Sequence, residues 1–325
     1  MKDKDKGLER FTSSRERSRR IRAVATDMDG SFLDGSGMVS PANQAAVEKL
    51  RKAGIRFMVC TGRSLREGSE PLKKAGISCD MIAMNGAAVY DADGVRKREY
   101  LLSMEKIQAV FHAVEAVRSQ LILQLVTEQG EFILADEAVF RRFFLTRIFP
   151  PQGEGRTGEE EDRLLADFIR ITPEEFFKLD VQCYKAVTLS EDTGLIRQIE
   201  GPLKAISGVC VAASFPTNWE ITHENASKGE GLADYAAGLG LSLDQVMAVG
   251  DGDNDISMIG LPLGWSVAMG NGAERLKEAA DIVTRSNRED GFAAAVDALL
   301  AARDGEGGEP PEERVPLEDG EPLRK

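Results

Sequence analysis

The sequence has few cysteines, and no two of them are close together along the chain. The four are far apart and form no Cys-x-x-Cys pair: Cys60, Cys79, Cys183 and Cys210. This spacing argues against a zinc cage or a disulfide framework and is typical of a reducing compartment. No apolar run approaches the roughly 20 residues that cross a bilayer, and residues 1–20 lack the apolar segment of a secretory signal. We therefore expect a cytoplasmic protein without a membrane partner.

Two common signatures of phosphate and ester chemistry are also missing. The chain contains neither the Gly-x-x-x-x-Gly-Lys-Ser/Thr loop of nucleotide-binding proteins nor the Gly-x-Ser-x-Gly elbow of serine hydrolases. Acidic residues outnumber basic ones, 54 to 41, so the formal net charge is −13, and no basic stripe interrupts the acidic body. A nucleic-acid partner is therefore not expected. The sequence gives no indication of the oligomeric state.

The two ends of the chain differ from the body in composition. Residues 1–20 hold eight basic and four acidic side chains, whereas residues 304–325 hold eight acidic and three basic ones and are rich in glycine and proline. We expect a disordered basic arm over residues 1–20 and a disordered acidic tail over residues 304–325. Contact of the basic arm with an acidic partner is the alternative.

The body of the chain alternates apolar runs with segments of helical pattern. Strands are predicted at 21–25, 55–60 and 81–84, with helices at 40–53 and 64–75 between them. The same style returns after residue 225, whereas residues 87–224 mix hairpins and helices. We predict an α/β protein whose Rossmann-like parallel-sheet core comprises residues 21–86 and 225–303, with residues 87–224 inserted as an α+β cap domain.

The first predicted strand ends at Asp27-Met28-Asp29-Gly30. In an extended chain Asp27 and Asp29 point to the same side, and two carboxylates so close are costly unless a cation or a transferred proton resolves the repulsion. The pair suits a nucleophile, an acid/base and a divalent metal. The alternative is a solvated, Asp-rich turn without chemistry.

A second acidic cluster, Asp251-Gly252-Asp253-Asn254-Asp255, follows the predicted strand at 246–249. A calcium loop of the EF-hand type would need Gly and Glu where the sequence has Ile256 and Pro262, so that interpretation fails. Because ligand-binding residues gather at the carboxyl ends of parallel strands, we expect this cluster to face Asp27 and Asp29. Carboxylate oxygens favour Mg²⁺.

Two further residues have side chains suited to phosphate. Thr61 follows the second predicted strand and is followed by a glycine, so its hydroxyl and neighbouring N–H groups suit a phosphate oxygen. Lys228 stands at a predicted helix start, where the helix dipole already favours anions. The alternatives are a helix cap for Thr61 and an ordinary surface position for Lys228.

Taken together, these motifs resemble the haloacid dehalogenase (HAD) superfamily, and more narrowly its Cof-type phosphatases of subclass IIB. The four HAD motifs are matched in order by 27–30, 61–63, 227–229 and 250–255, and the Cof pattern by 85–87, 268–271 and 286–291. Ser31 stands where Thr is usual and Gly272 where Ala is common. Residues 143–176 have no counterpart in the pattern, and such departures bear on substrate choice.

The resemblance implies a role for each matched residue. Asp27 would attack phosphorus and form an aspartyl-phosphate, and Asp29 would protonate the leaving alcohol and then activate water. The phosphoryl oxygens would be held by the Met28 backbone, Thr61, Gly62, Lys228 and Asn254. Mg²⁺ would be bound by Asp27, the Asp29 backbone carbonyl and Asp251, with Asp255 orienting the site.

These roles predict a Mg²⁺-dependent phosphatase that hydrolyses small phosphorylated metabolites, such as sugar phosphates, through an aspartyl-phosphate intermediate. Positioning and charge neutralisation are most of what phosphoryl transfer requires. A phosphomutase of the same superfamily and a non-catalytic phosphometabolite-binding protein are the alternatives.

Overall fold

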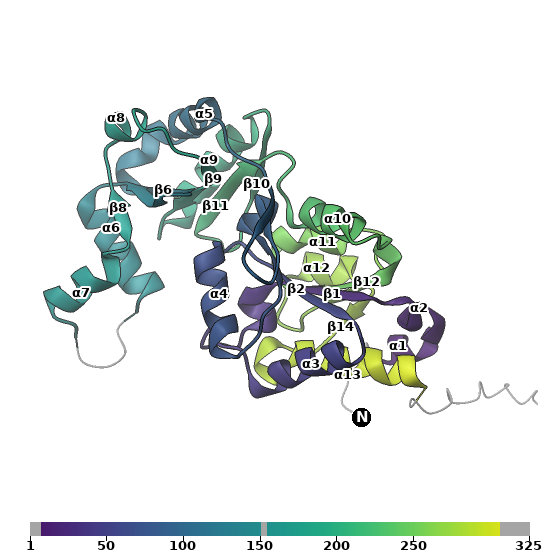
Figure 1. The fold of residues 1–325 in the computed structure, drawn as a ribbon. Helices are drawn as coiled ribbons and strands as arrows, with labels where there is room; N and C mark the ends of the chain where they lie inside the picture. The colour runs from purple at the N-terminus through teal and green to yellow at the C-terminus, as the bar shows by residue number, and fades with distance from the viewer. Residues whose placement is uncertain (1–7, 151–154, 306–325) are drawn as a thin grey trace, which may run out of the picture.

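The computed structural model describes residues 8–150 and 155–305, which form two β-sheets with helices around each (Figure 1). The elements of the larger sheet occupy the lower right of the view and those of the smaller sheet the upper left. No helix within the described ranges is long and apolar enough to cross a membrane. We call the larger sheet with its helices the core, and residues 101–224 the cap.

The core sheet has eight strands in the order β14-β13-β12-β1-β2-β3-β4-β5. All neighbouring strands are parallel except the pairs β3–β4 and β4–β5. The chain starts the sheet at β1 and extends it first to one side and later to the other, which places β1 at the point where the strand order reverses. The strands are β1 (Ala23–Thr26), β2 (Arg56–Cys60), β3 (Asp80–Ala83), β4 (Ala88–Tyr90), β5 (Arg96–Glu99), β12 (Val246–Gly250), β13 (Trp265–Ala268) and β14 (Ile282–Val283).

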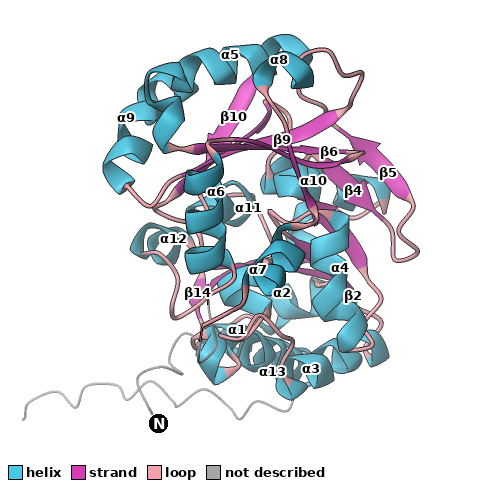
Figure 2. Cartoon of the chain, turned by 90° about the vertical axis from the view of Figure 1, so that its left-hand side faces the viewer, coloured by secondary structure: helices cyan, strands magenta, loops and turns pink. Residues whose placement is uncertain are grey.

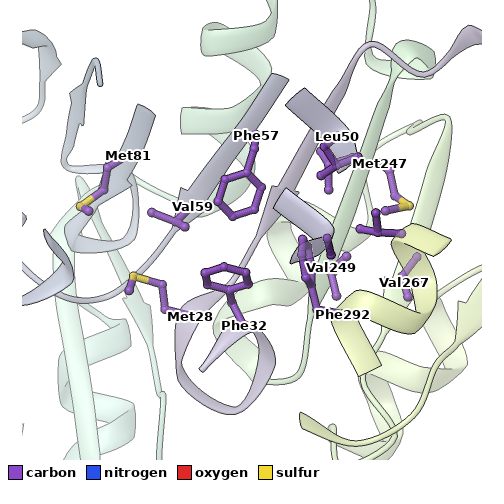
Figure 3. Packing of buried hydrophobic residues seen from close by; sticks show 14 of the residues in the cluster. Met28, Phe32, Leu50, Phe57, Val59, Met81, Met247, Val249, Val267 and Phe292 are labelled. Atoms are coloured by element: carbon purple, nitrogen blue, oxygen red, sulfur yellow. The ribbon is translucent and has the colours of Figure 1, made fainter. Parts of the chain in front are cut away.

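Helices cover both faces of the core sheet because its strands are apolar on both sides. One face packs into a cluster that contains Phe32, Phe57 and Phe292, whose rings lie 5.0 to 5.7 Å apart (Figure 3). The opposite face packs into a second cluster, which includes Leu232 and Leu276. The first face carries α3 (Pro41–Lys52), α4 (Leu65–Lys74) and α13 (Gly291–Asp304), and the second carries α10 (Lys228–Gly238), α11 (Ile256–Ile259) and α12 (Glu274–Ala279).

The cap sheet has six strands in the order β10-β11-β9-β6-β7-β8, and only the pair β7–β8 is parallel. One of its faces is covered by α5 and α9, which lie at the top of Figure 1, and by α8. The elements are α5 (Met104–Val114), the short helix Glu115–Gln120, β6 (Ile122–Thr127), β7 (Gly130–Leu134), β8 (Phe168–Arg170), α8 (Pro173–Phe176), β9 (Cys183–Leu189), α9 (Thr193–Lys204), β10 (Val209–Ala212) and β11 (Asn218–His223).

The other face of the cap sheet is only partly covered. At one end, a cluster of phenylalanines that includes Phe140, Phe143 and Phe144 packs on Ile122 and Val187 of the strands. These phenylalanines come from α6 (Glu137–Phe143) and the following turn Phe144–Ile148, while α7 (Gly158–Leu165) adds Leu165. The segment without a counterpart in the HAD pattern therefore supplies much of this cover. The rest of the face is turned to the core.

The prediction of a disordered arm over residues 1–20 is wrong for residues 9–20. Helices α1 (Glu9–Ser13) and α2 (Arg15–Arg20) pack near α13, as seen at the bottom of Figure 2 for α1. Phe11 is fully buried and meets Trp265 edge to face at 4.9 Å, and the Arg17 guanidinium lies 4.0 Å from the same ring. One buried aromatic ring thus outweighs the polar composition. Residues 1–7 and the predicted tail after residue 305 lie outside the described residues.

The predicted start of the insert at residue 87 also needs correction. The hairpin of β4 and β5, expected to open the cap, is the edge of the core sheet, with Ile82 of β3 paired to Val89 of β4. The hairpin folds back onto the preceding strand because only a short turn, Met84–Gly86, separates them. The second sheet therefore begins after residue 100.

Candidate active site

Asp27 stands directly after β1, and a lysine from a distant part of the chain is bonded to it. The ammonium of Lys228 lies 2.6 Å from Asp27 Oδ1 and 2.7 Å from Asp255 Oδ1. Lys228 is only 1% exposed, so the surface alternative for this residue is wrong. Ser227 caps helix α10 by accepting a hydrogen bond from the Glu230 N–H, which fixes where the lysine side chain starts.

Asp255 holds the second acidic loop in shape. Its Oδ2 accepts hydrogen bonds from the backbone N–H groups of Asp251 and Gly252, both at 2.9 Å. Asp251 in turn accepts a 3.0 Å hydrogen bond from the Ser31 hydroxyl. Gly30 has a φ of +81°, and a Cβ there would lie 2.2 Å from Asp251 Oδ2. Glycine is therefore required where the two acidic loops meet.

Three carboxylates of this site, from Asp27, Asp251 and Asp255, offer oxygen atoms within 4.8 Å of one another. Burial raises the pKa of Asp27 well above its ordinary value; Lys228 opposes this, while Asp255 and Asp251 add to it. Burial, followed by repulsion from Asp255, raises the pKa of Asp251 to about 6. One lysine does not balance three carboxylates, so the donor set fits a hard divalent cation with oxygen ligands.

Asp29 is directed to a different partner. Its carboxylate forms a bidentate pair with the Arg63 guanidinium, at 2.8 Å from Nε and 2.5 Å from Nη2, and its side chain is 42% exposed. It is not part of the acidic group, so a contribution of Asp29 to a metal site is restricted to its backbone carbonyl. Arg63 belongs to the motif at 61–63, but the sequence analysis assigned it no role. Its position two residues after Thr61 could have identified it as a residue of the site.

Thr61 is fully buried at the end of β2, and its Oγ1 accepts a 3.1 Å hydrogen bond from the Arg63 N–H. It does not cap α4, because Ser64 and Glu67 form that cap between them. A hydroxyl oxygen that accepts a hydrogen bond still carries a hydrogen to donate. Thr61 therefore keeps the donor that a phosphate oxygen needs.

Gly62 and Asn254 lie against the cap residues Glu220 and Ser214, and Met28 is fully buried. The Asn254 amide lies 3.1 Å from Ser214 Oγ and 3.4 Å from Asn85 Oδ1. A small cavity of about 70 Å³ borders Lys228 and Asn254, and the cap residue Glu220 lines it too. Asn85 and Glu220 were not among the predicted site residues, although Asn85 belongs to a matched motif.

A larger cleft lies between the core and the cap, with a volume of about 570 Å³. Its lining comes from both parts and includes aromatic and charged side chains, namely Tyr90, Tyr184, Arg66, Arg96, Glu131 and Asp167. Ser64 and Met84 also border it, and these residues directly follow Arg63 and precede Asn85 in the chain. The cleft therefore lies next to the loop that carries Thr61 and Arg63, the partner of Asp29.

Comparison with known proteins gives a consistent result. The model of the haloacid dehalogenase-like hydrolases matches residues 24–296. The 5-amino-6-(5-phospho-D-ribitylamino)uracil phosphatase YcsE of Bacillus subtilis is 27% identical over 278 residues, which cover 85% of this chain and 94% of that protein. Phosphatase YwpJ of the same organism is 28% identical over 303 residues, which cover 86% and 100%.

A solved structure has the same fold. The HAD subclass IIB sugar phosphatase BT4131 superposes with a TM-score of 0.70 at 20% sequence identity, over 86% of this chain and 99% of that one. Because the family model spans most of the chain, the fold and the resemblance predicted from the motifs are both confirmed. This chain belongs to the haloacid dehalogenase-like hydrolases and is a phosphoester hydrolase.

Proposed function

We propose that this hydrolase is a Mg²⁺-dependent phosphatase of small phosphorylated metabolites, with Asp27 as its nucleophile. The observation that carries the proposal is the position of Asp27, a carboxylate at a strand end with one oxygen 2.6 Å from the ammonium of Lys228. The attraction of Asp255 and Asp27 outweighs burial and keeps the pKa of Lys228 above its ordinary value. Lys228 therefore stays charged and favours the ionised Asp27 that nucleophilic attack needs.

The neighbouring residues have roles that follow from their contacts. The Arg63 fork holds the Asp29 carboxylate in place. Once protonated, Asp29 would give its proton to the leaving oxygen, and the carboxylate so formed would accept one from the attacking water. Thr61 and the backbone around Met28 and Gly62 supply donors to the phosphoryl oxygens. The step forms a bond between an Asp27 oxygen and phosphorus and breaks the ester bond, and hydrolysis of the aspartyl-phosphate then restores Asp27.

The donor set is suited to Mg²⁺. Asp27 and Asp251 would hold the ion through their carboxylates, with the Asp29 carbonyl as a further ligand. Asp255 acts differently, since its two oxygens already accept from Lys228 and from the Asp251 and Gly252 N–H groups. It orients the loop that carries Asp251. When bound, the ion supplies positive charge that neutralises the charge developing on the phosphoryl group.

A small, polar phosphate ester is the substrate class that we propose. The cleft of about 570 Å³ beside the site has the size of a small-molecule pocket and is lined by side chains of both charges. The related YcsE is named for a phosphorylated ribityl compound, and BT4131 is called a sugar phosphatase. By this analogy a phosphorylated sugar or polyol is favoured here. A cytoplasmic location and the lack of nucleic-acid and membrane partners remain part of the proposal.

The test is phosphate release from a panel of sugar and polyol phosphates and one aryl phosphate, each without an acceptor. We expect inorganic phosphate from at least one ester, loss of turnover in excess chelator and recovery with Mg²⁺. A phosphomutase would release none without a second sugar, and a silent binding protein would bind esters without turnover. Full activity in excess chelator would contradict the metal requirement.

A further inference from the structure

A β-bulge in the cap sheet turns two consecutive side chains toward the core. In the pairing of β6 with β9, Val126 lies opposite Lys185 and Thr127 lies opposite Cys183, so Tyr184 is the extra residue. Tyr184 packs in the core cluster, and the Lys185 ammonium donates to the Gly62 carbonyl oxygen. Bulges of this kind commonly redirect side chains next to functional sites.

Lys185 forms a buried ion pair with Glu220 of the neighbouring strand β11. The ammonium lies 3.1 Å from Glu220 Oε2, and the two side chains are only 9% and 7% exposed. Burial would raise the pKa of Glu220, but Lys185 and hydrogen bonds from Ser214 and Asn85 outweigh it and lower the pKa below its ordinary value. The pair is therefore ionised, and removal of one partner would leave a buried charge uncompensated.

Glu220 accepts hydrogen bonds with both of its oxygens. Oε2 accepts from Asn85 Nδ2 at 2.6 Å in addition to Lys185, and Oε1 accepts from Ser214 Oγ at 2.7 Å and Asn218 Nδ2 at 3.2 Å. One of these partners, Asn85, belongs to the core. A carboxylate with four donors is held rigidly, and so are the groups bonded to it.

The core residues that meet this ion pair belong to the loops of the active site. The Asn85 N–H bonds to the Thr61 carbonyl at 2.9 Å, and the Met84 N–H bonds to the Arg63 carbonyl at 2.9 Å. Met84 and Asn85 have φ angles of 51° and 56°, a left-handed backbone that only well-anchored residues keep. A Cβ on Gly62 would lie 3.2 Å from Glu220 Oε2, so the carboxylate sits directly against this turn.

We propose that Lys185 and Glu220 are positioning residues that hold the Gly62 turn and Asn254 in their phosphate-binding arrangement. They act from the cap and through core residues: Lys185 on the Gly62 carbonyl, and Glu220 on Asn85 and, by way of Ser214, on Asn254. This inference rests on the proposed function. It differs from a substrate contact, because groups that shape the phosphate site affect every phosphate ester alike, and inorganic phosphate as well.

The test compares Lys185→Met and Glu220→Gln with the wild-type enzyme, using inorganic phosphate as a competitive inhibitor and an aryl phosphate as substrate. We expect the inhibition constant for phosphate and the KM for the aryl phosphate to rise together by about tenfold, the size of a lost hydrogen bond to a charged group. The double variant should be no worse than the poorer single variant, because both residues act as one unit.

Thr188→Val is the matched control. Thr188 lies in the same strand as Lys185, is buried, and accepts a hydrogen bond from the Trp219 N–H inside the cap. The Thr188→Val substitution should lower the stability of the cap without changing the affinity for phosphate. If Lys185→Met or Glu220→Gln does not fold, Ser214→Ala removes one partly buried donor to Glu220 and should weaken phosphate binding by about threefold.

Each result separates the possible explanations. An unchanged inhibition constant for phosphate in folded Lys185→Met and Glu220→Gln would overturn the proposal. Unequal changes in KM among esters, with phosphate inhibition unchanged, would also overturn it and place Lys185 on the leaving group. If the wild-type protein hydrolyses no ester but binds phosphate, the phosphatase proposal fails, and the positioning role is still decided by phosphate affinity in the variants.

Discussion

The two sheets of this protein place their polar residues in different ways. In the core, the candidate catalytic residues lie beyond the ends of parallel strands, where β1, β2 and β12 lead into the loops of Asp27, Thr61 and Asp251. In the cap, Lys185 and Glu220 project from the middle of antiparallel strands. Parallel strands bring their carboxyl ends to one edge, whereas an antiparallel sheet offers a face of alternating side chains.

The two sheets also differ in whether their buried charges are balanced. In the core, the Lys228 ammonium is paired with the carboxylates of Asp27 and Asp255, and Asp251 adds a third carboxylate, so negative charge is in excess. In the cap, Lys185 is matched by Glu220. A charge excess makes a site that binds and polarises a ligand, whereas a balanced pair fixes the positions of its neighbours. We therefore expect the core to carry the reaction and the cap to arrange it, and the following variants test this expectation.

The largest effect is expected in the core, from Asp27→Asn. The amide keeps the shape of the side chain but is not a nucleophile, so kcat should fall by more than the roughly 10²–10³ that the loss of one electrostatic contact costs. Steady-state phosphate release measures it. Asp297→Asn, an exposed aspartate paired with Lys49, is the control and should keep full activity. Near-normal turnover of folded Asp27→Asn would show that Asp27 is not the nucleophile.

Lys228→Met should follow in size. It removes the buried cation that is paired with Asp27 and Asp255 while keeping much of the side-chain volume, and kcat should fall by roughly 10²–10³. The free energy of unfolding should fall too, because three carboxylates are left facing one another. Thermal unfolding and kcat are measured together. The exposed Lys204 of α9 provides a control, Lys204→Met, and equal kcat in both variants would contradict a role in the reaction.

Ser31→Ala tests the proposed metal site of the core. The hydroxyl that bonds Asp251 orients a carboxylate proposed to hold Mg²⁺, and losing such a partner typically weakens metal affinity by roughly 10–100-fold. The Mg²⁺ concentration that gives half-maximal activity should therefore rise, with little change in activity at saturating Mg²⁺. Ser36→Ala, which removes a hydroxyl bonded to the nearby Asp34, should leave it unchanged. An unaltered Mg²⁺ requirement in Ser31→Ala would argue against this metal site.

The smallest effect concerns the buried cap carboxyl group of Glu131, which accepts a hydrogen bond from the Gln124 amide. Burial and repulsion from Glu67 raise the pKa of Glu131 to about 7, while Gln124, Lys185 and Arg66 oppose the shift. The folded state then holds this proton more tightly than the unfolded state. Its contribution to stability is complete below pH 4.5 and is lost as pH rises through about 7.

Glu131→Gln should abolish this loss. The free energy of unfolding at pH 8 should exceed that of the wild type by on the order of 2 kcal/mol, and the decline between pH 4.5 and 7 should flatten. Urea unfolding across this pH range measures it. Glu105→Gln on the exposed side of α5 is the control, and it should follow the wild-type curve. If the free energies of unfolding of all three proteins changed with pH in the same way, the pKa of Glu131 would not be raised in the folded state.

The sequence by itself determined the sheet-and-helix alternation of the core and the residues that end its strands. Apolar runs of strand length predicted β1, β2, β3 and β12 within a few residues, and the polar motifs after them predicted which loops would meet. These features are local, because strand length and turn residues depend on neighbouring positions. The acidic group of Asp27, Asp251 and Asp255 followed from the rule that parallel strands share one edge.

The tertiary structure alone decided the pairings between distant residues. Lys228 sits 201 residues after Asp27, and its place between two carboxylates depends on where α10 packs. Asp29 was expected beside Asp27 and is bonded to Arg63, and Glu220 meets Asn85 across the boundary of core and cap. Phe11 shows the same for folding, since its ring packs against Trp265, which comes from a distant part of the chain. Composition and spacing describe a residue's neighbours in the chain, whereas its partners depend on the path that the whole chain takes.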